Sequence, residues 1–98
     1  MYAKKNITEN NKVLLAICDD SVKGKVFLED DVQIDCAGEY FNGERMVEEE
    51  IIRLCKSAKM ITAVGQECVA LLIREGFADK KNTKTVQGIP YAFVLFDE

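Results

Sequence analysis

Acidic residues in the first half of the sequence are candidates for metal chemistry. They follow an apolar run or occupy turns, and they are Asp19, Asp20, Glu29, Asp30, Asp31, Asp35 and Glu39. Carboxylate oxygens are the ligands that Mg²⁺ and Ca²⁺ prefer, so this group could serve a small carboxylate- or metal-dependent enzyme. Their spacing does not match an EF-hand loop, and aspartate is a common turn former. We therefore expect turns and a solvated face here, and we predict no metal ligand.

A polar loop near the carboxyl end forms the first part of the predicted binding surface. Its lysines, Lys80, Lys81 and Lys84, can attract RNA phosphates or an acidic protein. If the first and last strands of the fold pair, three further lysines would lie beside this loop: Lys4, Lys5 and Lys12. The net charge of −4 argues against a protein that binds nucleic acid mainly through phosphates. RNA is therefore expected as a weak partner at most.

The segment after this loop contains the only proline of the chain. Gly88 and Pro90 predict a turn, and Tyr91 at the edge of that turn offers an aromatic ring with a polar hydroxyl. We expect a partner to contact both the loop and the turn. The predicted binding residues are Lys80, Lys81, Lys84, Gly88, Pro90 and Tyr91.

Missing residue types and motifs argue against most enzyme classes. The chain has no histidine, which excludes a Ser-His-Asp or Cys-His nucleophile and a histidine base. It has neither a P-loop nor the G-x-G-x-x-G fingerprint of dinucleotide binding. We predict no catalytic residue and no cofactor.

The cysteines are expected to be reduced and metal-free. They are widely spaced without a C-x-x-C pair, at Cys18, Cys36, Cys55 and Cys68. Zinc sites usually have paired ligands at short spacing, and a cytosol keeps thiols reduced. Cys18 is a poor nucleophile, because Asp19 and Asp20 next to it raise the pKa of a thiol.

Hydrophobic periodicity predicts the elements that position these residues. Apolar or alternating runs bounded by polar turns predict strands at residues 2–7, 12–18, 25–28, 32–36, near 86 and at 91–96. Apolar residues three and four apart predict one helix over about residues 44–59. A second helix runs from about Ala63 to Glu75, with Gly76 as its left-handed C-terminal cap.

This order of elements predicts an α+β fold. Strands, two helices and then strands indicate a two-layer α/β sandwich, with one sheet and both helices packed on one face. The 98 residues suffice for one domain, over residues 1–98. The residues expected to be nearly fully buried are Leu15, Ile17, Ile51, Leu72, Val94 and Phe96.

The sequence predicts neither a membrane span nor a signal peptide. The longest apolar runs, residues 13–18 and 68–73, are far shorter than the roughly 20 residues that a bilayer requires. The first residues lead into polar Asn6 and not into an apolar segment. A cytoplasmic location is expected.

Several segments, taken in order, resemble a known family. They are M-Y-A-K, A-I-C-D-D-S-V-K-G-K-V-F, F-N-G-E-R-M-V-E-E-E-I, A-V-G-Q-E-C-V-A-L-L-I-R-E-G-F and V-Q-G-I-P-Y-A-F-V. Together they resemble an archaeal family catalogued as domain of unknown function four-two-four. The resemblance implies an archaeal, cytoplasmic protein with a two-layer α/β sandwich. It supplies no activity, and it implies an association with the archaeal translation machinery.

The functional prediction is a small, non-enzymatic interaction module. Its partner is expected to be a protein or a ribonucleoprotein, and the lysine loop and the residue 88–91 turn would contact it. One alternative is the carboxylate- or metal-dependent enzyme described above. Another is a homo-oligomeric structural protein, with a sheet edge or Tyr40 and Phe41 as its interface.

Overall fold

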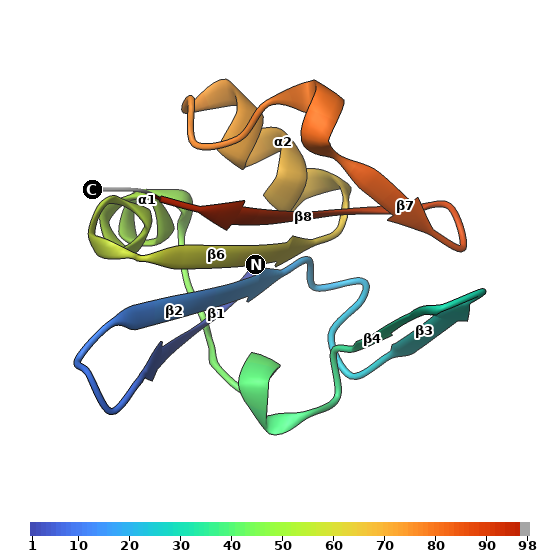
Figure 1. The fold of residues 1–98 in the computed structure, drawn as a ribbon, viewed down its shortest axis with the longest axis horizontal. Coiled ribbons are helices and arrows are strands. Elements are labelled where there is room, and N and C mark those ends of the chain that lie inside the picture. Colours follow the sequence, from blue (N-terminus) through green and yellow to red (C-terminus); the bar gives the residue numbers. More distant parts are fainter. Residues whose placement is uncertain (97–98) are drawn as a thin grey trace.

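The computed structural model describes residues 1–96, which fold around a six-stranded mixed sheet with the strand order β5-β1-β2-β6-β8-β7 (Figure 1). The strands of this sheet are β1 (Tyr2–Ile7), β2 (Val13–Cys18), β5 (Glu44–Arg45), β6 (Met60–Val64), β7 (Lys84–Val86) and β8 (Ile89–Leu95). The neighbours β2 and β6 are parallel, and the other neighbouring pairs are antiparallel. A separate hairpin consists of β3 (Val26–Glu29) and β4 (Val32–Asp35).

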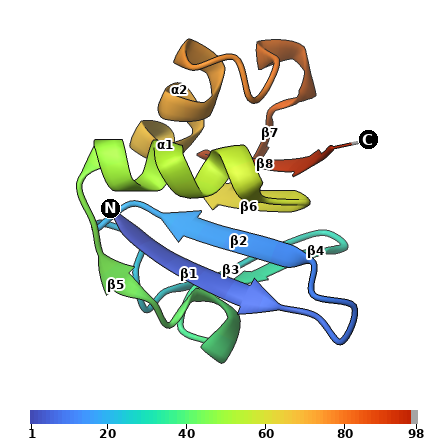
Figure 2. The same cartoon turned by 90° about the vertical axis from the view of Figure 1, so that its left-hand side faces the viewer.

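Two helices cover one face of the sheet, as Figure 2 shows. They are α1 (Glu48–Ser57) and α2 (Gln66–Arg74). Ile51 of α1 and Leu72 of α2 are fully buried in the same cluster as Ile17 of β2. The α+β prediction, with both helices on one face, is confirmed.

The other face of the sheet is covered over part of its area by the β3–β4 hairpin and the short 3₁₀ helix η1 (Glu39–Phe41). Phe27, Ile34 and Phe41 pack there against residues of β2, β6 and β8. The predicted single sheet is therefore accompanied by a small second one. Phe41 and Tyr40 form an edge-to-face pair on this side, with ring centroids 5.5 Å apart.

Strand β6 is the element that the sequence prediction missed. Ala63 was expected to begin the second helix, but residues 60–64 form a buried strand between β2 and β8. Gly65 separates this strand from α2 at φ +116° and ψ 156°, a conformation that is almost exclusive to glycine. Ile61, Thr62 and Val64 before a glycine were the available signal, because β-branched residues favour strands.

The helix ends differ in how well they were predicted. Glu44 was expected in the first helix but lies in β5, and α1 begins four residues later at Glu48. The end of α2 is confirmed: Gly76 has φ +80°, its N–H donates to the Ile73 carbonyl, and the Phe77 N–H donates to the Leu72 carbonyl. These two hydrogen bonds define a Schellman cap.

The predicted core is confirmed in the centre of the sheet and wrong at its edge. Leu15, Ile17, Ile51 and Leu72 are fully buried. Val94 and Phe96 are only partly buried, because the last part of β8 has a neighbouring strand on one side alone. In the part of the chain that the structure describes, no helix has the length and apolar character needed to cross a membrane.

Candidate functional site

Strand β8 has an open edge beyond Tyr91. On one side it pairs with β6, from Tyr91 opposite Val64 to Leu95 opposite Met60. On the other side it pairs with β7 only from Ile89 to Tyr91, where Lys84 lies opposite. The chain before β7 turns away into the 3₁₀ helix η2 (Lys80–Asn82). Residues 92–95 therefore lack a neighbouring strand on that side within the described chain.

The register shows which backbone groups face this open edge. The Gly65 N–H donates to the Pro90 carbonyl, and the Phe96 N–H donates to the Lys59 carbonyl. Backbone groups alternate in direction along a strand, so residues 92 and 94 also face β6. The N–H and C=O groups of Phe93 and Leu95 point the opposite way, and no described residue forms a hydrogen bond with them.

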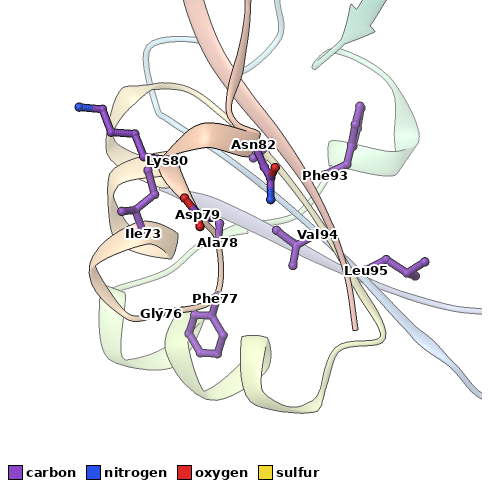
Figure 3. Close-up of a pocket in the computed structure, with 11 residues that line it drawn as sticks. Ile73, Gly76, Phe77, Ala78, Asp79, Lys80, Asn82, Phe93, Val94 and Leu95 are labelled. Carbon is purple, nitrogen blue, oxygen red and sulfur yellow. The ribbon is translucent and has the colours of Figure 1, made fainter. Parts of the chain in front are cut away.

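A cavity of about 620 Å³ lies beside this edge. Residues 92–95 form one wall, and the carboxyl end of α2 with residues 76–80 and Asn82 forms the other (Figure 3). The side chain of Val94 points towards Ala78 across the cavity, whereas Phe93 and Leu95 point to the opposite face of the sheet. We call this cavity and the strand that borders it the β8 groove.

Phe93 and Leu95 are unusually exposed for their size, at 60 % and 66 %. They lie on the sheet face that the β3–β4 hairpin covers only in part. Phe93 also lines an apolar hollow of about 410 Å³ together with Leu14, Met60 and Tyr40. The open edge therefore carries free backbone groups and apolar side chains at the same positions.

The structure brings the lysine loop to the β8 groove. Lys80 lines the groove itself, and Lys81 and Lys84 line an adjacent hollow of about 300 Å³ with Tyr91 and Phe93. The Tyr91 ring is buried and packs against Phe93, with centroids 5.6 Å apart. Phe93, which the sequence analysis did not single out, is the exposed aromatic residue beside the lysines.

Gly88 and Pro90 lie outside the groove. Gln87 and Gly88 both have positive φ and form the two-residue turn between β7 and β8. Together with Pro90, Gly88 lines a separate hollow of about 270 Å³ near Asp19 and Gly65. The six predicted binding residues are thus divided between two places.

The larger lysine patch does not form. It required the first and last strands to pair, but β2 and β6 separate β1 from β8. Lys4 and Lys5 of β1 therefore lie near the opposite edge of the sheet from the lysine loop. The first and last strands do not pair, because β2 and β6 lie between them and β6 was not predicted as a strand.

The acidic residues that have partners in the structure have structural roles, but Asp19 does not lie on the expected solvated face. Asp19 is buried, and its two carboxylate oxygens accept the N–H groups of Glu67 and Cys68 at 2.9 and 2.8 Å. Asp20 pairs with the terminal amino group at 3.0 Å, which lowers the pKa of its carboxyl group. Among residues 1–96, no group of three acidic, cysteine or histidine side chains is placed to hold a metal ion.

The thiols are buried and unreactive by environment. Burial raises the pKa of Cys36 to about 12 and that of Cys55 to about 11, and it also raises the pKa values of Cys18 and Cys68. All four are free thiols in the structure. A raised thiol pKa means a smaller thiolate fraction, and the thiolate is the nucleophile.

We expect a thiol-specific reagent at pH 8 to leave the native protein unlabelled and to label all four cysteines after unfolding.

The folded state holds its thiol protons more tightly than the unfolded state, so the free energy of unfolding should fall as pH rises from about 9 towards 11. Intact mass spectrometry checks the labelling, and denaturant titrations at several pH values check the stability. Fast labelling of native protein, a disulfide or bound zinc would contradict this account.

Comparison with known proteins gives a family and a fold. A family model described as "Protein of unknown function (DUF424)" matches residues 7–95. No curated protein matches the chain. A crystal structure of an uncharacterized conserved protein from Methanopyrus kandleri is similar, with a TM-score of 0.76 and 18 % sequence identity. The match covers 99 % of this chain and 93 % of that one, and at this identity it shows a shared fold alone.

Proposed function

Because the chain belongs to the DUF424 family, whose function is unknown, we propose from its own geometry that it is a protein-interaction module that binds a partner in the β8 groove. The observation that carries the proposal is the open edge at Phe93 and Leu95. A sheet edge with unpaired backbone groups is a template for another chain, and proteins usually protect such edges. Here the edge is instead bordered by a cavity and by exposed apolar side chains.

The alternative enzyme has less support. Four of the seven candidate carboxylates have structural partners: Asp19 caps α2, Asp20 pairs with the amino terminus, Glu29 accepts the Gln87 N–H, and Asp35 accepts the Ala37 N–H. Most residues around the β8 groove are apolar, but polar atoms make up more of its exposed lining, and Asp79, Lys80 and Asn82 are among the lining residues. That lining suits a peptide better than it suits acid–base chemistry.

Site-specific photocross-linking in cells of the source organism tests this proposal. A benzoylphenylalanine at Phe93 should cross-link to a partner protein, because this side chain is exposed at the groove. The same residue at Val47 is the matched control, since Val47 is 57 % exposed and apolar but lies beside β5 at the opposite edge of the sheet. Equal cross-linking from both positions, or none from Phe93, would contradict the proposal.

The identity of the cross-linked species tests the finer prediction about the partner. The resemblance implies a partner from the archaeal translation machinery, and a ribosomal protein or translation factor in the adduct would support it. A direct adduct with RNA would move the proposal to nucleic acid. We expect RNA to contribute little, because the lysine loop is small and the net charge is −4.

A further inference from the structure

We infer that the β8 groove takes an extended segment of a partner protein, which adds as a strand antiparallel to β8 and carries acidic side chains at its carboxyl end. This inference rests on the proposed function and specifies the chemistry of the partner. It does not follow from the existence of an interaction module, because such modules also bind helices and folded surfaces.

Backbone hydrogen bonding argues for an extended segment. Phe93 and Leu95 each present an N–H and a C=O group at the open edge, two residues apart. A strand supplies the matching donors and acceptors at the same spacing, whereas a helix has already used its own. Strand addition to a free sheet edge is an established mode of peptide recognition.

The side chains around the edge argue for alternating apolar residues in that segment. Residues opposite Phe93 and Leu95 would lie on the face where those two side chains are exposed. The residue between them would point to the other face, into the cavity formed by Val94, Ile73 and Ala78. Both faces of the added strand would therefore bury apolar surface. This burial would stabilise the complex beyond what the backbone hydrogen bonds at the edge contribute.

The lysine loop argues for acidic residues at one end of the segment. Lys81 and Lys84 lie at the Tyr91 end of the edge, next to Phe93. Lys81 has a nearby carboxylate, Asp79, but at 3.9 Å between two exposed groups this ion pair is weak. Asp79 is also held by the Lys81 N–H, which donates to its Oδ1. An acidic residue of the partner would therefore meet available positive charge.

A second copy of this chain is the competing occupant. Two β8 edges that pair antiparallel would place their lysine loops at opposite ends of the interface, so repulsion between the loops does not exclude this arrangement. The positive charge of the lysines favours the acidic partner, and a concentration-dependent dimer would indicate the second copy instead.

The direction of the added strand follows from its position in line with β7. Strand β7 is antiparallel to β8, and antiparallel pairing is slightly the more stable arrangement. An antiparallel segment beside residues 92–95 has its carboxyl end nearest Tyr91. Its acidic residues should therefore lie at that end, beside Lys81 and Lys84.

Binding of a designed peptide tests the inference with the intact protein. The probe is a blocked peptide of alternating threonine and valine that ends in two glutamates, titrated by NMR. N-methylation of the two peptide amides that face β8 should weaken binding about tenfold or more, and N-methylation of the amide between them should not. Moving the glutamates to the amino end should also weaken binding. Absence of binding at millimolar peptide, or equal effects of both N-methylations, would overturn the inference.

Variants of the protein provide the complementary test. Leu95→Pro removes one edge N–H without touching a hydrogen bond to β6, and Leu95→Ala is its matched control because it keeps that N–H. The proline variant should bind the peptide more weakly than the alanine variant, because only proline removes the N–H that would donate to a peptide carbonyl. Lys81→Glu should weaken the peptide about fivefold at low salt, and Lys5→Glu on β1 should have little effect.

The outcomes separate this inference from the proposed function. Suppose that a partner cross-links to Phe93, but that neither N-methylation of the peptide nor Leu95→Pro changes peptide binding. That result would support an interaction module and would overturn strand addition. A concentration-dependent dimer that Leu95→Pro abolishes would make a second copy the occupant and overturn the acidic peptide. Loss of cross-linking at Phe93 would overturn the proposed function itself.

Discussion

Replacing Gly65 with alanine should lower the free energy of unfolding by about 4 kcal/mol or more. Gly65 has φ +116° at the junction of β6 and α2, where any other residue is strained. A Cβ atom at this position would also clash with the Asp19 carboxylate, whose nearest atom would lie 2.3 Å away. The carboxylate cannot move aside, because it holds the first turn of α2.

Gly76→Ala is the control for the backbone contribution alone. Gly76 has φ +80°, and a Cβ atom there would meet nothing within 4 Å. Its substitution should cost about 1 kcal/mol, from the left-handed conformation only. Denaturant unfolding of both variants measures the difference, and similar costs at the two positions would show that the contact with Asp19 is unimportant.

Replacing Asp19 with alanine should cost about 3–4 kcal/mol, the second of the two largest effects. The variant would leave the N–H groups of Glu67 and Cys68 without this acceptor, and the hydrogen bond to Cys68 is buried whereas the one to Glu67 is part-buried. It would also remove a negative charge from the N-terminus of α2. Asp19→Asn should cost less, because one amide oxygen can still accept one of the two hydrogen bonds.

The stability effects of Gly65→Ala and Asp19→Ala should be coupled in a double-mutant cycle. Once Asp19 is truncated to alanine, most of the clash at residue 65 is removed, so the double variant should be more stable than the sum of the single costs predicts. Asp20→Ala is the control for the carboxylate, since Asp20 is half-exposed and pairs at the surface. Additive costs, or an equal effect of Asp20→Ala, would contradict the role given to Asp19.

Local signals in the sequence predicted those parts of the fold that depend on local physics. The strands at 2–7 and 12–18 and the cap at Gly76 follow from alternation, apolar runs and a glycine at a helix end. Strand β6 was missed because the five residues from Met60 to Val64 are mostly apolar, and in so short a run a buried strand and a buried helix look alike. The β-branched residues and Gly65 were the local signal, but the conformation of Gly65 that ends the strand depends on the tertiary structure.

The candidate site was predicted only in part, for a related reason. The lysine loop and Tyr91 were recognised by residue type, and they do meet near the groove. The exposure of Phe93 and Leu95 was not predictable, because an apolar run such as residues 91–96 usually belongs to a covered strand. Their exposure depends on where β7 begins, because its first residue, Lys84, lies opposite Tyr91. The sequence of β8 does not indicate that its neighbour has only three residues.

Amide hydrogen exchange at β8 tests the central claim most directly. In the free protein, the N–H groups of Phe93 and Leu95 should exchange fast, whereas those of Ala92 and Val94 should be protected by β6. Addition of the acidic, alternating peptide should protect Phe93 and Leu95 and leave the protection of their neighbours unchanged. If Phe93 and Leu95 are already protected without the peptide, or stay unprotected when it is bound, the β8 edge is not a binding site for a strand.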